Sequence, residues 1–366
     1  MVIFNQDSSE TEKNMGETLQ KKRIAWIDNA RAIAIFFIVL GHINVSGQFC
    51  TYLNSFHVPL FFFISGLTFS AKDKPLDFLK KKVKRILVPY LIFSSISIFI
   101  YLVFGKAAAN KLEGTDYMLS LRQCIYGMLY GARGNGFMSW NRPLWFLPCL
   151  FSLLVIAYLI RRFIFRNSDN IVFTVASLII CFLMFRKMLY VNYFPVLPFG
   201  LTQAASASPF FILGILTRQV TDGCGEKIKL KIGWRIALCA VLIAAGAFVN
   251  SRNTTFVGFS YNQFGNLWIY TLSAVLSVFG WCLFSGLFRS KAVEYVGNNT
   301  MTILVMHKFP IVFYSLISIP GLSENIFIGI LFSALTVAMC LGVGFIIERI
   351  CPFIIGKEKR RANAQN

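Results

Sequence analysis

The chain contains three histidines, His42, His57 and His307, and each lies in a strongly apolar segment. A neutral imidazole can take a proton from a hydroxyl group, because its unperturbed pKa lies near neutral pH. A single histidine in a membrane helix is more often a packed or interhelical hydrogen-bonding residue. His42 and His57, however, fall at neighbouring ends of two consecutive apolar segments, which favours general-base chemistry there. A metal site would need a third ligand, and we expect His307 to lie too deep to supply one.

The first apolar segment also carries Asp28 and Arg31. A charged side chain at the centre of a membrane helix costs about 2.5–3.5 kcal/mol, so such residues are functional candidates by default. Asp28 lies one turn before Arg31 and can pair with it. The step from Arg31 to His42 spans about 16 Å of helix and returns to within about 20° of the same direction. One helix face thus carries an ion pair at one end and an imidazole at the other. Asp28, Arg31, His42 and His57 are the predicted catalytic residues.

A basic segment, FLKKKVKRILVPY, covers residues 78–90. Lys81 and Arg85 are one helical turn apart, and with Lys82 they could clamp the phosphates of a nucleotide. A plain topology signal, or contact with anionic lipids, would produce the same cluster. We predict Lys81, Lys82 and Arg85 as cofactor-binding residues, together with Arg31.

The segment GNNTMTILVMHKFPI covers residues 297–311 and begins like a capped helix. We expect His307 and Lys308 in the inner half of the resulting membrane span. Lys308 either snorkels to the inner interface or adds positive charge to the path that starts at Arg31. Under the second hypothesis His307 and Lys308 also belong to the cofactor-binding set.

A further candidate segment, SWNRPLWFLPCLF, covers residues 139–151. Trp140 and Trp145 are typical of the aromatic belt at a membrane interface. Together with Asn141 and Arg142 they also offer a stacking surface and hydrogen-bond donors for a sugar. We therefore predict these four residues as substrate-binding.

The composition identifies the class of protein. The chain has 366 residues, of which 56% are hydrophobic and 14% charged, and a mean hydropathy of +0.63. These values are typical of a polytopic membrane protein. The net charge of +20 does not indicate nucleic acid, because the basic residues fall between apolar segments. The nine cysteines include no C-x-x-C pair, and only Cys50 and Cys124 fall where an external disulfide is conceivable.

We predict an all-α bundle of about ten transmembrane helices, with a polar and basic leader at 1–23, a membrane domain at 24–350 and a basic tail at 351–366. If the N-terminus is cytoplasmic, the inner segments hold 26 Lys and Arg and the outer segments hold 8, which favours both termini inside. The predicted spans are 24–45, 55–71, 86–104, 143–165, 171–186, 199–217, 234–250, 265–288, 301–319 and 325–349.

Several of these segments together resemble the acyltransferase 3 family of integral membrane O-acyltransferases, most closely its fucose O-acetylase-like single-domain members. The family's Arg-x10-His element is Arg31 and His42 within DNARAIAIFFIVLGH. Its basic R-x-x-x-R element corresponds to Lys81 and Arg85, with a lysine in the first position, which loses the bidentate geometry of arginine. The other matching strings are FHVPLFFFISG (56–66), PLWFL (143–147) and HKFP (307–310).

The resemblance implies an acyl-coenzyme A donor, usually acetyl-coenzyme A, held on the cytoplasmic side by the basic cluster and Arg31. It also implies an acceptor hydroxyl on a surface polysaccharide or lipid-linked glycan outside a bacterial cytoplasmic membrane, with His42 activating that hydroxyl or briefly carrying the acyl group. Two alternatives stay open: a transporter or flippase that uses the buried charges as a proton relay, and a non-catalytic sensor.

Overall fold

The computed structural model describes residues 25–43, 47–112, 119–134, 136–166, 170–190, 196–224, 231–322 and 324–357. The predicted leader at 1–23 and residues 358–366 of the predicted tail lie outside these ranges. Every named element among the described residues is a helix. The predicted all-α membrane bundle is therefore confirmed.

The helices follow one another with short connections. The longer ones are α2 (Ala25–His42), α3 (Gly47–Leu67), α4 (Pro75–Lys82), α5 (Val88–Leu112), α6 (Leu121–Tyr130), α7 (Phe146–Leu159), α8 (Ile171–Tyr190), α9 (Leu201–Cys224), α10 (Ile232–Asn250), α11 (Leu267–Ser285), α12 (Lys291–Asn298), α13 (Thr300–Met306), α14 (Lys308–Leu316) and α15 (Ile326–Ile350). Short 3-10 helices cover Arg142–Trp145 (η2), Pro198–Gly200 (η4), Phe259–Tyr261 (η6) and Pro352–Ile355 (η7), and π-helical turns cover Val83–Leu87 (η1) and Ile160–Ile164 (η3).

Each of the ten predicted spans has a helical counterpart. Among the described residues, eight helical segments are long and apolar enough to cross a membrane. The two counterparts outside this set are α3, which carries several polar residues, and the short pair α13–α14. The number of crossings and their orientation stay predictions.

Helix α3 begins at Gly47, about two turns before the predicted start at residue 55. Gly47 has a positive φ of 81°, which suits a glycine at a sharp entry into a helix. Thr51 donates a hydrogen bond to the Gly47 carbonyl, and Asn54 donates one to the Cys50 sulfur. Because the helix satisfies these polar groups, it extends further than hydropathy indicates, and His57 lies in its third turn.

The segment 300–316 is broken into α13 and α14 at His307. Pro310 explains the break, since proline has no N–H to donate to the carbonyl four residues earlier and its ring crowds that carbonyl. In this sequence that carbonyl belongs to Met306, the last residue of α13. The predicted continuous span at 301–319 is therefore two short helices with His307 at their junction.

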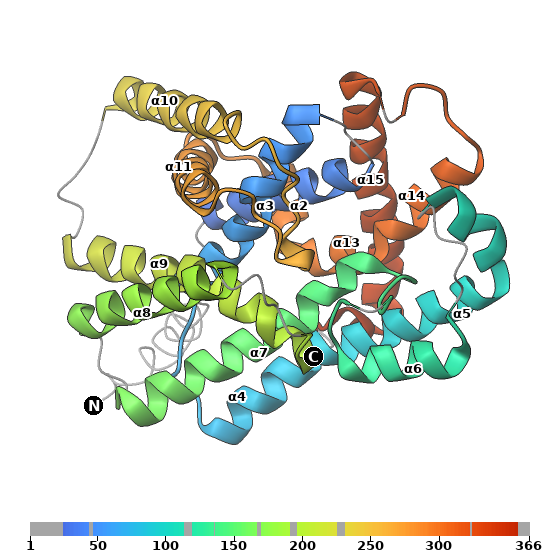
Figure 1. Cartoon of the computed structure of the whole chain (residues 1–366), viewed down its shortest axis with the longest axis horizontal. Helices are drawn as coiled ribbons and strands as arrows, with labels where there is room; N and C mark the ends of the chain where they lie inside the picture. The colour runs from blue at the N-terminus through green and yellow to red at the C-terminus, as the bar shows by residue number, and fades with distance from the viewer. Residues whose placement is uncertain are drawn as a thin grey trace, which may run out of the picture.

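Helices α2 and α3 lie at the centre of the molecule, with α10 and α11 on one side and α13 and α15 on the other (Figure 1). Helix α3 crosses α9 at very close range. A Cβ added to Gly66 would lie 1.8 Å from the Phe211 carbonyl oxygen, and one added to Gly214 would lie 2.1 Å from the Phe63 carbonyl oxygen. Two glycines thus let the backbones touch, as small residues do between membrane helices.

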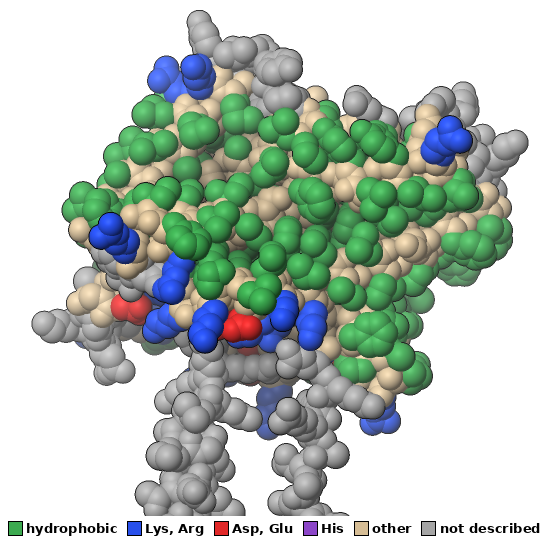
Figure 2. Space-filling model, turned by 90° about the horizontal axis from the view of Figure 1, so that it is seen from below, with side chains coloured by type: hydrophobic (Ala, Val, Ile, Leu, Met, Phe, Trp, Pro, Cys, Tyr) green, Lys and Arg blue, Asp and Glu red, His purple; other side chains and the backbone are tan. Residues whose placement is uncertain are grey.

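The outer surface is strongly apolar. Large hydrophobic side chains are exposed along α5, α8, α10 and α15, among them Phe99, Val172, Val241 and Leu331. In Figure 2, hydrophobic side chains cover most of the face shown, and Lys and Arg gather mainly along its lower edge. Such a broad apolar band bordered by basic residues is what a lipid-embedded protein presents.

Candidate active site

His42 ends α2 and lines a cavity of about 480 Å³. Ile38 and Gly41 of the same helix line it too, so the last turn of α2 forms part of the wall. The preceding turns of α2 are packed into the core, with Ala34, Ile35 and Val39 fully buried. Because the helix is fixed along its length, the His42 ring is presented to the cavity from a rigid support.

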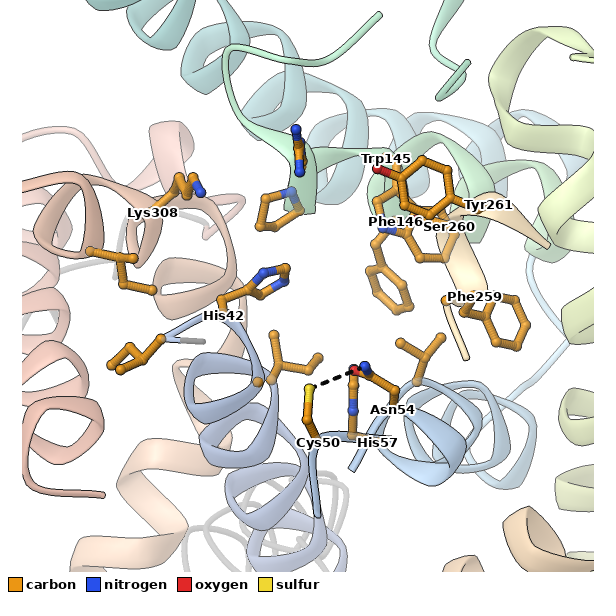
Figure 3. A pocket seen from close by; sticks show the side chains of 18 of the residues that line it. His42, Cys50, Asn54, His57, Trp145, Phe146, Phe259, Ser260, Tyr261 and Lys308 are labelled. Atoms are coloured by element: carbon orange, nitrogen blue, oxygen red, sulfur yellow. Dashed lines mark hydrogen bonds between the residues drawn. The ribbon is translucent and has the colours of Figure 1, made fainter. Parts of the chain in front are cut away.

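His57 reaches the same cavity from α3. Its Nδ1 lies 2.5 Å from the Leu53 carbonyl oxygen. A carbonyl oxygen can only accept, so Nδ1 carries the hydrogen and the neutral ring keeps its lone pair on Nε2. Figure 3 shows His57 and Asn54 side by side below His42. The cavity therefore has two imidazoles on its wall, as the sequence predicted, and an amide that the sequence analysis did not identify.

The ring of His307 contacts the ring of His42. The two ring centroids are 5.3 Å apart with 38° between the planes, and His307 has no solvent exposure. Its Nδ1 lies 2.9 Å from the Ile303 carbonyl oxygen, while its Nε2 has no hydrogen-bond partner. The expectation that His307 lies deep in the inner half of a span, far from His42, is wrong.

His307 lies near His42 because α12 and α13 follow α2 from its start to its end. The backbone at Gly297 touches the Asp28 carbonyl at the start of α2, where an added Cβ would lie 1.9 Å from the oxygen. Ten residues further on, His307 reaches His42 at the end of α2. Lys308 consequently lines the cavity beside His42 rather than lying near Arg31. The contact of Lys308 with a coenzyme stays a prediction, although Lys308 lies at the His42 end of α2 and not at the Arg31 end where the path was expected to start.

An aromatic wall stands across the cavity from His42. It is formed by Trp145 and Phe146 at the start of α7 and by Phe259 and Tyr261 in the connection between α10 and α11 (Figure 3). The Trp145 and Phe259 rings stack with centroids 6.0 Å apart. Tyr261 is the exposed ring of this wall, while Trp145, Phe146 and Phe259 are buried and present only part of their surface to the cavity. Aromatic surface of this kind suits the apolar faces of a sugar ring. Trp145 was predicted for this role, whereas residues 256–261 were missed.

The connection between α10 and α11 is held by its own hydrogen bonds. Asn253 donates to the Phe264 carbonyl at 2.9 Å and accepts from the backbone N–H of Asn266 at 3.2 Å. Gly258 and Gln263 exchange two backbone hydrogen bonds. The loop therefore presents residues 256–261 to the cavity in one fixed conformation, although its sequence has no periodic pattern that would have predicted it.

Three cationic side chains line the cavity: Arg133, Arg142 and Lys308. Arg133 bonds the Ser260 hydroxyl at 2.6 Å and lies 3.8 Å above the Tyr261 ring. No Asp or Glu occurs among the described lining residues. Arg142 was predicted as a substrate contact, while Arg133 was missed. The available signal for Arg133 was its glycine-rich segment GARGNG, in which Gly134 and Gly136 have positive φ.

Trp140 and Asn141, predicted to bind substrate beside Arg142 and Trp145, do not line the cavity. Asn141 is fully buried and donates to the Ser97 hydroxyl at 3.0 Å, which ties the segment before α7 to α5. Trp140 is almost fully buried and packs near Gly127 of α6. Neighbouring helices cover both side chains, and Trp140 Nε1 and Asn141 Oδ1 are buried without a hydrogen-bond partner.

Asp28 and Arg31 lie at the other end of α2 from the cavity. Their side chains form a salt bridge of 3.0 Å, with Asp28 buried and Arg31 30% exposed. The predicted pairing of these two residues is confirmed. By helix geometry Arg31 is about 16 Å from His42 along the axis.

The basic segment 80–85 is joined to this same end by a series of contacts. Gly356 abuts the Arg85 backbone, and Lys357 donates to the Asn299 carboxamide oxygen at 2.7 Å. Asn299 caps α12, whose Gly297 touches Asp28. This series of contacts links the backbone of the basic cluster to the end of α2 that carries the ion pair.

The cationic side chains of the cluster point outward. Lys81 is exposed and forms a 3.0 Å ion pair with Asp73, and Lys82 lies 5.1 Å above the Phe78 ring. Arg85 is exposed on the π-helical turn η1, whose i→i+5 hydrogen bonds change the angular offset between Lys81 and Arg85 from that of the expected α-helix. The two residues remain available as a loose cationic surface rather than as one preformed clamp.

Cys50 and Cys124 are free thiols, so the conceivable disulfide is not formed. Across the described ranges, no three side chains of His, Cys, Asp or Glu cluster closely enough to hold a metal ion.

A family model described as "Acyltransferase domain" matches residues 24–349. No curated protein and no solved structure matches the chain at a significant level.

Proposed function

This chain belongs to the acyltransferase 3 family, because the family model covers nearly its whole length, and it is a membrane acyltransferase. From that premise we propose that it moves an acyl group, typically acetyl, from cytoplasmic acyl-coenzyme A to a hydroxyl group of a surface or lipid-linked glycan. We further propose that it works in the cytoplasmic membrane of a bacterium. The family match gives no support to the alternative of a transporter.

One observation carries this proposal: α2 has a cationic end and an imidazole end, and the imidazole end opens on a cavity. Arg31 lies at one end, which a series of packing contacts links to the basic cluster, and His42 with the cavity lies at the other. A phosphate-bearing donor and a hydroxyl-bearing acceptor can therefore approach the two ends of the same helix. The separation of about 16 Å suits a donor whose thioester sits at the end of a long flexible arm.

The transfer step follows from ordinary acyl chemistry. An unprotonated nitrogen of His42 accepts the proton of the acceptor hydroxyl while the hydroxyl oxygen attacks the thioester carbonyl. The tetrahedral intermediate then expels the coenzyme A thiolate, which takes the proton back from the His42 imidazolium. The ester product and free coenzyme A account for all atoms. Lys308 and Arg133 face the same space and would stabilise the negative charge on the oxygen of the intermediate.

The donor end is supported by charge. Arg31, Lys81, Lys82 and Arg85 supply guanidinium and ammonium groups, which is the chemistry that the phosphates of coenzyme A require. Anionic membrane lipids compete for the same groups, because their headgroups carry the same chemistry.

The acceptor end is supported by shape and lining. A cavity of about 480 Å³ falls within the usual range for sites that enclose a small ligand. Trp145 and Phe259 line it with aromatic surface, while Asn54, Ser260 and Arg142 offer hydrogen bonds. This combination of aromatic faces and polar groups is suited to a sugar.

The test is acyl-ester analysis of surface polysaccharide from cells that lack the protein, complemented with wild type, His42→Ala or His42→Gln. We expect mass increments of one acetyl group with wild type only. Loss of a general base lowers the rate by about 10²–10⁴-fold. His42→Gln keeps the volume and polarity of the side chain, so it separates loss of the base from loss of packing. Unchanged glycan in every strain would refute the proposed acceptor.

A further inference from the structure

The Nε2 atom of His307 is a buried hydrogen-bond acceptor that has no partner. The Nδ1–H is committed to the Ile303 carbonyl oxygen at 2.9 Å, which leaves the lone pair of the neutral ring on Nε2. An unpaired acceptor in a protein interior is unfavourable, because it loses the hydrogen bond that water would supply. Several other buried side-chain polar atoms of the described residues also have no partner, and Nε2 of His307 differs from them because its ring contacts the ring of His42.

The nearest aromatic ring is that of His42, with ring centroids 5.3 Å apart. This distance allows one hydrogen bond between the edges of two imidazoles. No such bond is recorded in the structure, but the half-buried His42 ring lies at the end of its helix, and rotation about its side-chain torsion would turn an N–H toward His307. His42 has one N–H to donate in its neutral form, and His307 has one lone pair to receive it.

We propose that His307 is a positioning residue for His42: its Nε2 accepts the N–H of His42 and so fixes which nitrogen of His42 is unprotonated and faces the acceptor hydroxyl. This inference rests on the proposed function, in which His42 is the general base. In the ground state the bond orients the ring. When His42 takes the hydroxyl proton, the same N–H belongs to an imidazolium and the bond becomes charge-assisted, which strengthens it. No proton passes to His307.

A purely structural role explains less of this arrangement. The Ile303 carbonyl already accepts the backbone N–H of His307 at 2.9 Å, so it does not need the side chain as a second donor. Complete burial of an imidazole is also a poor way to fill space, since a leucine would do so without an unpaired nitrogen. Neither hydrogen bonding to Ile303 nor filling of space explains why an imidazole with an unpaired Nε2 contacts the ring of His42.

Two amide substitutions separate the two nitrogens of His307. The short side chain of His307→Asn places its NH2 group near the position of Nδ1, which keeps the bond to Ile303 and removes the acceptor beside His42. The longer side chain of His307→Gln places its amide oxygen near the position of Nε2, which keeps that acceptor. We expect His307→Asn to lower kcat by about 10–100-fold, the range for partners that orient a histidine, with the KM values for donor and acceptor nearly unchanged. His307→Gln should retain most of the activity.

The experiment uses purified full-length protein in lipid vesicles, with acetyl-coenzyme A as donor and polysaccharide from the deletion strain as acceptor. Greater activity of His307→Gln than of His307→Asn supports the proposal. The reverse order, equal loss in two folded variants, or no loss in either overturns it. Wild-type activity that His42→Ala does not reduce would instead refute the proposed function of His42.

A spectroscopic measurement covers the case in which His307→Gln does not fold. The chain has only three histidines, so ¹⁵N-labelled histidine gives three imidazole signals in untagged protein. We expect a hydrogen-bonded N–H signal of His42 in wild type that disappears in His307→Asn. The same His42 signal in both proteins would overturn the proposal.

Discussion

Replacing Gly66 by alanine should separate α3 from α9 and weaken both the fold and the activity. The added Cβ would lie 1.8 Å from the Phe211 carbonyl oxygen, whereas such contacts are essentially never shorter than 3.0 Å. The two backbones must therefore move apart by about 1.2 Å. Overpacking of a tight interface costs about 1–3 kcal/mol, and the upper part of that range is expected because backbone cannot rotate away.

The same movement should affect catalysis, because α3 also carries His57 in the cavity wall. A misplacement of about 1 Å at a reacting group can cost about 10²-fold in rate. We therefore expect Gly66→Ala to lower kcat by up to about a hundredfold in protein that remains folded.

The assay is unfolding of the detergent-solubilised protein by increasing SDS, followed by helix content, together with acetyl transfer in vesicles. Gly342→Ala in α15 is the matched control, because a Cβ there meets no atom within 4 Å. Gly214→Ala should reproduce the effect of Gly66→Ala, and the double variant should cost less than the sum, since one separation relieves both clashes. If Gly66→Ala unfolds and reacts like Gly342→Ala, the close crossing of α3 and α9 is refuted.

Three further predictions concern the two ends of α2. Asp28→Asn removes the 3.0 Å ion pair with Arg31 and should lower the free energy of unfolding by about 1.5–3 kcal/mol in the SDS assay; an unchanged value would contradict a stabilising pair. Arg85→Gln should raise the KM for acetyl-coenzyme A by about ten- to hundredfold, with a larger effect at low salt, and Lys81→Arg should lower this KM. If both variants have the same KM for acetyl-coenzyme A as wild type, this segment is not part of the donor site. Trp145→Ala should raise the acceptor KM and leave the donor KM unchanged; the opposite pattern would assign the aromatic wall to the donor.

Most of the fold was predictable because long apolar segments separated by basic loops determine where helices can form. The exceptions have a common cause. Thr51 and Asn54 lower the hydropathy at the start of α3, yet they lie on a helix whose polar groups are satisfied locally or face the cavity. Hydropathy alone does not distinguish a polar residue in a loop from one that lines an internal cavity.

The site was partly predictable. His42, His57, Arg142 and Trp145 were identified from residue type and position, and all four line the cavity. The position of His307 was missed because it depends on the alignment of α13 with α2, which is a tertiary property. Asn141 was misjudged for the same reason, since the Ser97 hydroxyl that it bonds is 44 residues away.

The loop between α10 and α11 forms one part of the cavity wall, and the end of α2 forms another. Asn253 and the Gly258–Gln263 pair hold the loop internally. Arg133 and Gln203 also bond its Ser260, and Phe259 packs against Phe62 of α3, whereas His42 lies on α2. Mutations at Tyr261, whose ring packs against Arg133, can therefore alter the aromatic wall apart from α3, whereas a mutation at Phe259 also acts on the helix that carries His57. Natural selection can diversify the acceptors of such an enzyme by changing one loop, while the chemistry at the end of α2 is inherited unchanged.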